Sequence, residues 1–190
     1  MLTFNEAIHE YRYDGVKIPS VSEILERAGL SDFSMVSGRV LQIAQERGSF
    51  VHLACELFNR GVLDLDTVDP ELIGYVDGWM AFCRDFKPKF KLIEQRLCNI
   101  ELGYAGTPDC TALIKRKNTL IDIKTGGKTK AHEPQHGAYS MLDGIGHISE
   151  AWTVYLSKDG KYKIGIHDLF NGQRIFLAAL EIHKYKNRGN

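Results

Sequence analysis

The apolar positions in the first half of the chain recur at helical spacing. Over residues 39–58, apolar side chains return every three or four positions, which predicts a helix with an interruption at Arg47-Gly48. The same spacing predicts shorter helices at about 20–29 and 70–86. Ahead of all three, the turn residues Asp14-Gly15 predict a short hairpin.

The spacing changes to that of β-strands after residue 88. Segments 90–97, 104–115 and 119–125 alternate or run apolar, which predicts a three-stranded antiparallel meander. The last turn of the meander is expected near residues 116–118. The other expected elements are a helix at 134–142, strands at 151–156 and 161–167, and a helix at 170–186. Together these elements predict an α+β fold with a central mixed β-sheet flanked by helices.

The composition is that of an ordinary globular protein, with 44% apolar and 25% charged residues in 190. This length predicts one domain over 1–190, with the hairpin and helix of about 1–35 as an appended N-terminal segment. No stretch of the sequence approaches the roughly 20 apolar residues that span a membrane, and the N-terminus does not resemble a signal peptide. We therefore expect a cytoplasmic protein with no membrane partner.

The charges cancel over the whole chain but not locally. A formal net charge of zero argues against a protein that coats nucleic acid without specificity. However, residues 111–136 hold six basic side chains against two acidic ones, and residues 56–77 hold six acidic side chains against one basic one. The chain is therefore polarised, and the alternative interpretation of each segment is a solvated charged surface.

Asp122 and Lys124 lie two positions apart in an apolar run, so on a strand both side chains point to the same face. With the turn near residue 116, antiparallel pairing places Asp109 opposite about residue 124. A divalent cation would offset the cost of burying these charges, and Mg²⁺ prefers oxygen ligands such as carboxylates and the Ile123 carbonyl. Lys124 would orient an attacking water or stabilise charge on a phosphoryl oxygen. The alternative is a surface ion pair.

Further polar residues surround this group in the sequence. His52 and Glu56 are spaced by four on a predicted helix, as are Gln135 and Tyr139 at the start of a later helix. Glu94 follows two apolar residues in the first predicted strand. All five could instead be interior or capping side chains, and Glu56 fits best as a structural residue or a partner of His52. The further candidates, as phosphate contacts, are His132 and His136.

The order of these residues resembles the PD-(D/E)XK nuclease superfamily. The matching motifs are Gly48-x-x-x-His52, Glu94, Gly106-Thr-Pro-Asp109, Ile121-Asp-Ile-Lys-Thr-Gly126 and Gln135-x-x-x-Tyr139. Within the superfamily, the sequence is most similar to the RecB-like branch, which includes phage recombination exonucleases. Any single motif is weak, whereas the ordered set over residues 48–139 is specific.

The resemblance implies a restriction-endonuclease-like fold and a metal-dependent deoxyribonuclease. The implied ligands of one or two Mg²⁺ or Mn²⁺ ions are Asp109, Asp122, the carbonyl of Ile123, and His52. Lys124 would be the catalytic lysine, and Glu94 would support the metals. Gln135 and Tyr139 would contact DNA or brace the site. The basic loop expected to grip the DNA backbone contains Lys115, Arg116, Lys117, Lys128 and Lys130.

The preferred activity is that of an exonuclease acting at duplex DNA ends in phage-type recombination or repair. A single-strand annealing protein and further copies of the chain are the partners considered. An endonuclease or nickase, and a non-catalytic nucleic-acid-binding accessory subunit with the same fold, are the alternatives. The sequence departs from relatives in having Ile123 where many carry an aromatic residue. No cysteine follows Cys110, so we expect no iron–sulfur cluster.

Overall fold

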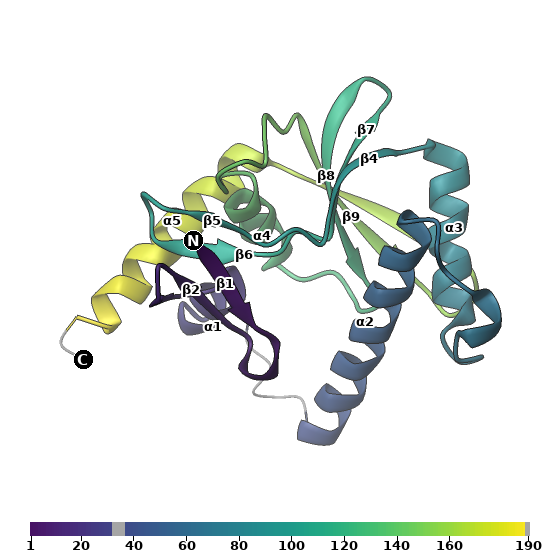
Figure 1. Ribbon diagram of the computed structural model, residues 1–190, viewed down its shortest axis with the longest axis horizontal. Coiled ribbons are helices and arrows are strands. Elements are labelled where there is room, and N and C mark those ends of the chain that lie inside the picture. The colour runs from purple at the N-terminus through teal and green to yellow at the C-terminus, as the bar shows by residue number, and fades with distance from the viewer. Residues whose placement is uncertain (32–36, 189–190) are drawn as a thin grey trace.

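The computed structural model describes residues 1–31 and 37–188 (Figure 1). The helices are α1 (Val21–Arg27), α2 (Gly38–Asn59), α3 (Ile73–Phe86), α4 (His132–Tyr139) and α5 (Leu169–Lys186). The strands are β1 (Leu2–Asn5), β2 (Glu10–Tyr13), β3 (Val16–Ile18), β4 (Lys89–Ile93), β5 (Leu97–Asn99), β6 (Tyr104–Gly106), β7 (Cys110–Ile114), β8 (Lys117–Lys124), β9 (Glu150–Leu156) and β10 (Tyr162–His167). None of the helices in these two ranges combines the length and the apolar run needed to cross a membrane.

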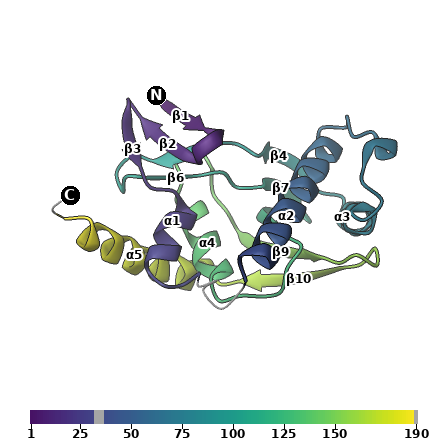
Figure 2. The ribbon, with the colours of Figure 1, turned by 90° about the horizontal axis from the view of Figure 1, so that it is seen from below.

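A five-stranded mixed sheet forms the centre of the molecule, in the order β10-β9-β8-β7-β4. β8 and β9 are parallel, and the other neighbouring strands are antiparallel. The sheet flanked by helices confirms the predicted α+β class. In Figures 1 and 2, α2 and α3 cover one side of the sheet, and α1, α4 and α5 lie together on the other.

Alternation along β8 divides its side chains between the two sides of the sheet. Ile121 and Ile123 are buried in a core with the apolar faces of α2 and α3. Leu120 is buried in the second core, with α1, α4 and α5. Because side chains alternate along a strand, Asp122 and Lys124 share the Leu120 side and face α4.

The N-terminal segment packs beside the central sheet rather than extending it. β1, β2 and β3 form a separate sheet, and β5 and β6 form a hairpin between β4 and β7. Ala105 of β6 donates a backbone hydrogen bond to the Pro19 carbonyl at 3.0 Å. Ser20 then caps α1 by accepting a hydrogen bond from the Glu23 N–H. These contacts attach the segment to the chain that leads into β7.

Three details of the predicted elements are wrong. α2 continues through Arg47-Gly48, because one glycine costs a helix only about 1 kcal/mol and the turns on both sides are helical. The predicted strands 90–97 and 104–115 are each divided in two by the β5–β6 hairpin. The last turn is Lys115-Arg116, where both residues have positive φ, as a two-residue type I′ turn requires.

The position of that turn changes the strand register. Cys110 pairs with Ile121 and Ile114 pairs with Lys117. The same register extended by one residue places Asp109 opposite Asp122, two positions from the expected partner. A shift of two residues keeps each side chain on its original face, so the predicted grouping is preserved.

Candidate active site

Asp109 lies immediately before β7 and is fixed by the neighbouring strand. Its Oδ2 accepts a hydrogen bond from the Ile123 backbone N–H at 2.6 Å, and its side chain is nearly buried. Burial alone would raise the pKa of this carboxyl, but His52, Lys124 and the Ile123 N–H outweigh that effect and lower it. Asp109 is therefore an anion held at the end of the β7–β8 pair.

Asp122 and Lys124 form a partly buried ion pair on the α4 side of β8. Asp122 is 1% exposed. The Lys124 ammonium donates a hydrogen bond to Oδ1 at 3.0 Å and lies 2.9 Å from Oδ2, which accepts no well-directed hydrogen bond. Burial lowers the pKa of Lys124, but the charges of Asp122 and Asp109 more than compensate and raise it. The lysine is therefore cationic at neutral pH.

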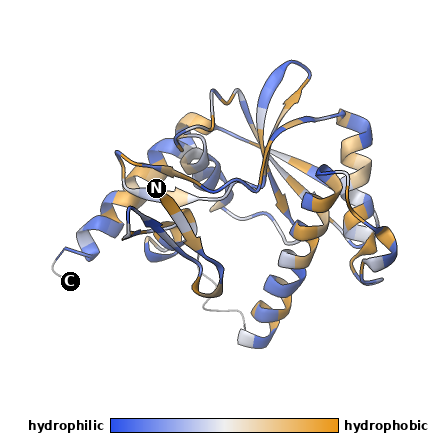
Figure 3. Ribbon diagram, viewed as in Figure 1, coloured by the Kyte–Doolittle hydropathy of each residue, from blue (hydrophilic) through white to orange (hydrophobic). Residues whose placement is uncertain are grey.

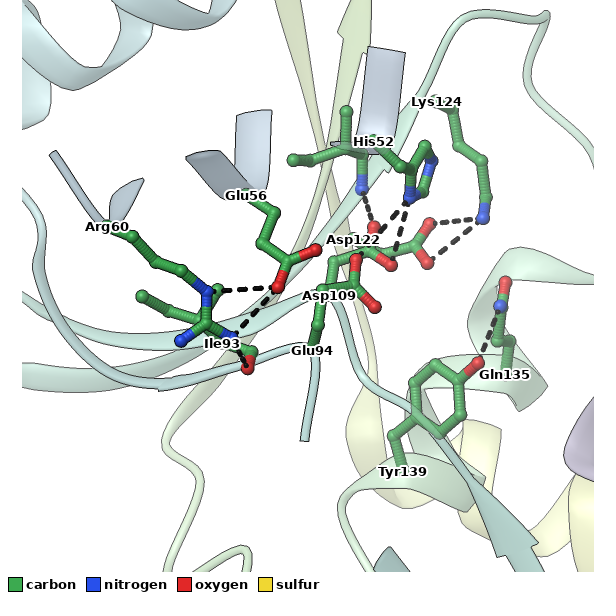
Figure 4. Close-up of polar contacts among 11 residues, drawn as sticks. His52, Glu56, Arg60, Ile93, Glu94, Asp109, Asp122, Lys124, Gln135 and Tyr139 are labelled. Atoms are coloured by element: carbon green, nitrogen blue, oxygen red, sulfur yellow. Dashed lines mark hydrogen bonds and ion pairs between the residues drawn. The ribbon is translucent and has the colours of Figure 1, made fainter. Parts of the chain in front are cut away.

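His52 and Glu94 complete a cluster around Asp109 (Figure 4). His52 Nδ1 lies 3.3 Å from Asp109 Oδ1 and 3.9 Å from Glu94 Oε1. Burial disfavours the charged imidazole, but the two carboxylates raise the pKa of His52 to about 10. Glu94 has a left-handed backbone (φ 46°), and its N–H donates to the Asp109 carbonyl at 2.9 Å. This strained residue is thus tied to the segment that carries Asp109.

The donor atoms of this cluster suit a hard divalent cation. One ligand atom from each of His52, Glu94 and Asp109 lies within 4.8 Å of the others. The carboxylate oxygens of Asp109 and Glu94 match the ligands of Mg²⁺ or Mn²⁺, and the His52 imidazole would ligate after releasing its proton, which a bound cation favours. Glu94, expected only as a supporting acid, belongs to this group. Asp122 is engaged by Lys124 instead, although its Oδ2 still lacks a hydrogen bond. Ligation by the Ile123 carbonyl stays a prediction.

Gln135 and Tyr139 lie on the face of α4 that is directed toward the site. Gln135 donates a hydrogen bond to the Tyr139 hydroxyl at 3.2 Å (Figure 4). The Tyr139 ring packs on Gly106, where a Cβ atom would lie only 2.7 Å from Cε1. Because Gly106 begins the Gly-Thr-Pro-Asp segment, Tyr139 braces the loop that ends in Asp109. Glu56 accepts a hydrogen bond from Arg60 and forms an ion pair with it, which fits its structural interpretation.

A layer of hydroxyl and imidazole groups lies behind Asp122 and Lys124. Its members His132 and His136 were expected as phosphate contacts and are buried, whereas the other members of the layer were not predicted. The parallel register places Thr153 beside Asp122 and Tyr155 beside Lys124. The Thr153 hydroxyl lies 2.9 Å from Nε2 of both His136 and His167, and the Tyr155 hydroxyl lies 2.8 Å from His132 Nδ1. Burial lowers the pKa of His132 to about 4 and of His136 to about 3. The sequence signal for this polar layer is the Thr-x-Tyr spacing in the strand after α4.

The basic residues that were expected in one loop lie in two separate groups. Lys128 and Lys130 lie in the exposed stretch 126–130 that follows β8 at the site. Lys115, Arg116 and Lys117 lie at the tip of the β7–β8 hairpin, a hydrophilic projection in Figure 3. The seven residue steps from Lys117 to Lys124 span about 23 Å. The prediction of one loop is therefore wrong, because β8 separates the two groups, and their contact with DNA stays a prediction.

Comparison with known proteins gives structural neighbours but no family. No protein-family model matches the chain, and no curated protein matches its sequence. An alkaline exonuclease (LHK-Exo) from Laribacter hongkongensis superposes with a TM-score of 0.40 at 14% identity, over 89% of this chain and 91% of that one. LHK-Exo in complex with dAMP superposes with a TM-score of 0.38 at 15% identity, over 90% and 92%.

Proposed function

We propose that this chain is a metal-dependent deoxyribonuclease that hydrolyses phosphodiester bonds in DNA. The observation that carries the proposal is the convergence of His52, Glu94 and Asp109 beside the Asp122–Lys124 pair. These five residues come from α2, the end of β4, the start of β7, and β8. Each uncompensated charge in such a group destabilises the fold by several kcal/mol. A cluster of this kind is therefore expected at a functional site.

Each residue has a role that its contacts support. Asp109, Asp122, His52 and Glu94 would hold one or two Mg²⁺ or Mn²⁺ ions. A bound ion supplies Lewis acidity at the phosphate and lowers the pKa of a water molecule. Lys124, kept cationic by its neighbours, would orient the attacking water or stabilise the negative charge that develops on the phosphoryl oxygens.

The preferred subtype is an exonuclease that acts at duplex ends in phage-type recombination or repair. Its support is the motif order in the sequence together with the restriction-endonuclease-like fold that this order implies. Lys128 and Lys130, next to the site, would contact backbone phosphates, which position a nuclease without reading sequence. A single-strand annealing protein and a homo-oligomer are the expected partners beside DNA.

An assay on linear and closed circular duplex separates the alternatives. With Mg²⁺ or Mn²⁺, wild type should release nucleotides from linear DNA and spare the circle, whereas an endonuclease would cut both. Asp122→Asn and Lys124→Ala should each lower the rate at least a hundredfold, by analogy with the loss of one charge-stabilising group. The matched controls are Asp159→Asn and Lys163→Ala, whose side chains are exposed in or beside the β9–β10 hairpin. DNA binding without cleavage in any metal would favour the accessory subunit.

A further inference from the structure

A cavity of about 960 Å³ adjoins the candidate site, between α1, α2 and the 125–131 segment. Its wall includes Ser22, Arg47, His52, Lys124, Thr129 and Gln135. Three of these residues, His52, Lys124 and Gln135, also belong to the candidate site, so the two spaces are continuous. The volume is at the upper end of the roughly 300–1,000 Å³ range of small-molecule sites, which leaves room for a few nucleotides of one strand but not for a duplex.

Half of the ten arginines of this chain have an acidic partner in the structure, and Arg47 is not among them. The paired arginines are Arg12, Arg27, Arg60, Arg84 and Arg96. Among the residues described, no carboxylate lies within ion-pair distance of Arg47, and its buried Nε donates no hydrogen bond. Its guanidinium lies 5.7 Å from the centre of the Tyr75 ring. The Tyr75 ring therefore packs against a guanidinium whose buried Nε–H donor lacks an acceptor.

The charged residues of the cavity wall favour an anionic ligand such as a phosphate backbone. Lys124 is already paired with Asp122, so Arg47 is the unpaired strong cation among the described residues of the wall. Glu26 is the one carboxylate among them, and small or hydroxyl residues such as Gly126 and Thr125 contribute much of the remainder. A planar guanidinium with free N–H donors matches the geometry of a phosphate.

The helix sets the distance between this cation and the metal cluster. Arg47 precedes His52 by five residues on α2, which corresponds to about 7.5 Å along the helix axis. Phosphates along one strand are about 3.4 Å apart along the axis of B-form DNA. The axial separation of the two positions corresponds to about two of these steps, so a phosphate neighbouring the one at the cluster is the candidate partner of Arg47.

We propose that the cavity receives the strand to be cut and that Arg47 binds a backbone phosphate one or two nucleotides from the cut. This inference rests on the proposed nuclease function and adds to it a strand-binding subsite. Arg47 is a binding residue for the substrate backbone and takes no part in the chemical step.

A charge-deletion cycle between protein and DNA tests the subsite. Each duplex substrate carries a single uncharged methylphosphonate. The series of substrates places it in turn at each of the first four phosphates on either side of the cut. Single-turnover cleavage in Mn²⁺ is measured for wild type, Arg47→Ala and Arg174→Ala. Arg174 is the matched control, since it also lies 5.9 Å from the centre of an aromatic ring, that of Phe170, and is an exposed residue of α5. Circular dichroism confirms that each variant is folded.

Wild type and Arg174→Ala should be slowed about tenfold to a hundredfold by a methylphosphonate at one position, as expected for loss of a charge-assisted hydrogen bond. Cleavage by Arg47→Ala should no longer be slowed by a methylphosphonate at that position, and should respond as wild type does to a methylphosphonate at every other position. Identical profiles for Arg47→Ala and wild type would overturn the subsite. If wild type cleaves nothing, the nuclease proposal fails separately, and the same cycle measured by binding of methylphosphonate-containing single strands still decides whether Arg47 contacts a phosphate.

Discussion

At the scale of single residues, backbone groups position the site as much as side chains do. The Ile123 N–H holds the carboxylate of Asp109, and the Glu94 N–H holds its carbonyl. Gly106 lets the Tyr139 ring approach the loop that carries Asp109. A change of side chain at these positions therefore acts on the site through the shape of the chain.

Gly106→Ala should lower both stability and activity. The new Cβ would lie 2.7 Å from the Tyr139 ring and 3.2 Å from Val21, so the loop leading to Asp109 must move. Overpacking of this kind costs about 1–3 kcal/mol of unfolding free energy. Urea titration and cleavage rates measure the two effects. Gly38→Ala is the control, because a Cβ there meets nothing within 4 Å. Wild-type stability and rate in Gly106→Ala would contradict the bracing role of Tyr139.

Thr153→Val tests the layer of polar groups behind Asp122. The substitution removes the hydroxyl that contacts both His136 and His167, and leaves two buried ring nitrogens without a partner. Each unsatisfied group costs about 1–3 kcal/mol. The urea midpoint should fall with an unchanged slope. Thr153→Ser, which keeps the hydroxyl, should lose less, and equal losses in the two variants would show that the hydroxyl does not matter.

At the scale of elements, the local spacing on β8 was predictable but its neighbours were not. The Asp-x-Lys spacing placed Asp122 and Lys124 on one face, and a register error of two residues did not alter that result. The parallel partner β9 follows a crossover through α4, so no local pattern could pair Thr153 with Asp122. The basic residues of 115–130 are close in sequence but not in space, because an eight-residue strand separates the two groups.

The packing of α4 against β9 and β10 should make stability depend on pH. His136 is neutral when folded, with its pKa lowered to about 3 from 6.5, and it faces Thr153, His167, His132, Asp122 and Lys124. As the pH falls below 6.5, the unfolded state binds the proton first. This contribution is therefore complete above pH 6.5 and is lost progressively towards pH 3, by about 2 kcal/mol at pH 5.

Unfolding titrations at pH 7 and pH 5 check this contribution. His136→Gln should lose less stability between the two pH values than wild type, by about 2 kcal/mol. The control, His147→Gln, replaces an exposed histidine and should keep the wild-type dependence. An unchanged dependence in His136→Gln would show that this imidazole is not held neutral by the fold.

At the scale of the whole molecule, the metal cluster joins parts of the chain that the sequence keeps far apart. α2 brings His52 across one face of the sheet to Asp109, while the N-terminal segment supports the β5–β6 hairpin that leads into the same loop. The motif order identified these residues, with Glu94 as a supporting acid. It could not show that Glu94 offers one of the three donor atoms, because that depends on the left-handed backbone of Glu94 after β4. A bound ion should therefore stabilise the fold as a unit.

Divalent metal should raise the melting temperature of wild type and not of cluster variants. At a hundred times its dissociation constant, an ion that binds only the folded state adds about 2.7 kcal/mol. Differential scanning fluorimetry with Mn²⁺ should show this shift in wild type and in the control Asp159→Asn. The shift should be much smaller in Asp109→Asn and Glu94→Gln. A full shift in Glu94→Gln would remove Glu94 from the ligand set.

The most direct test of the metal centre is anomalous diffraction from a crystal soaked in Mn²⁺. The account predicts an anomalous peak within about 2.5 Å of an Asp109 carboxylate oxygen, with further ligands among His52, Glu94 and Asp122. Mn²⁺ bound elsewhere on the protein, with no peak beside Asp109, would contradict it.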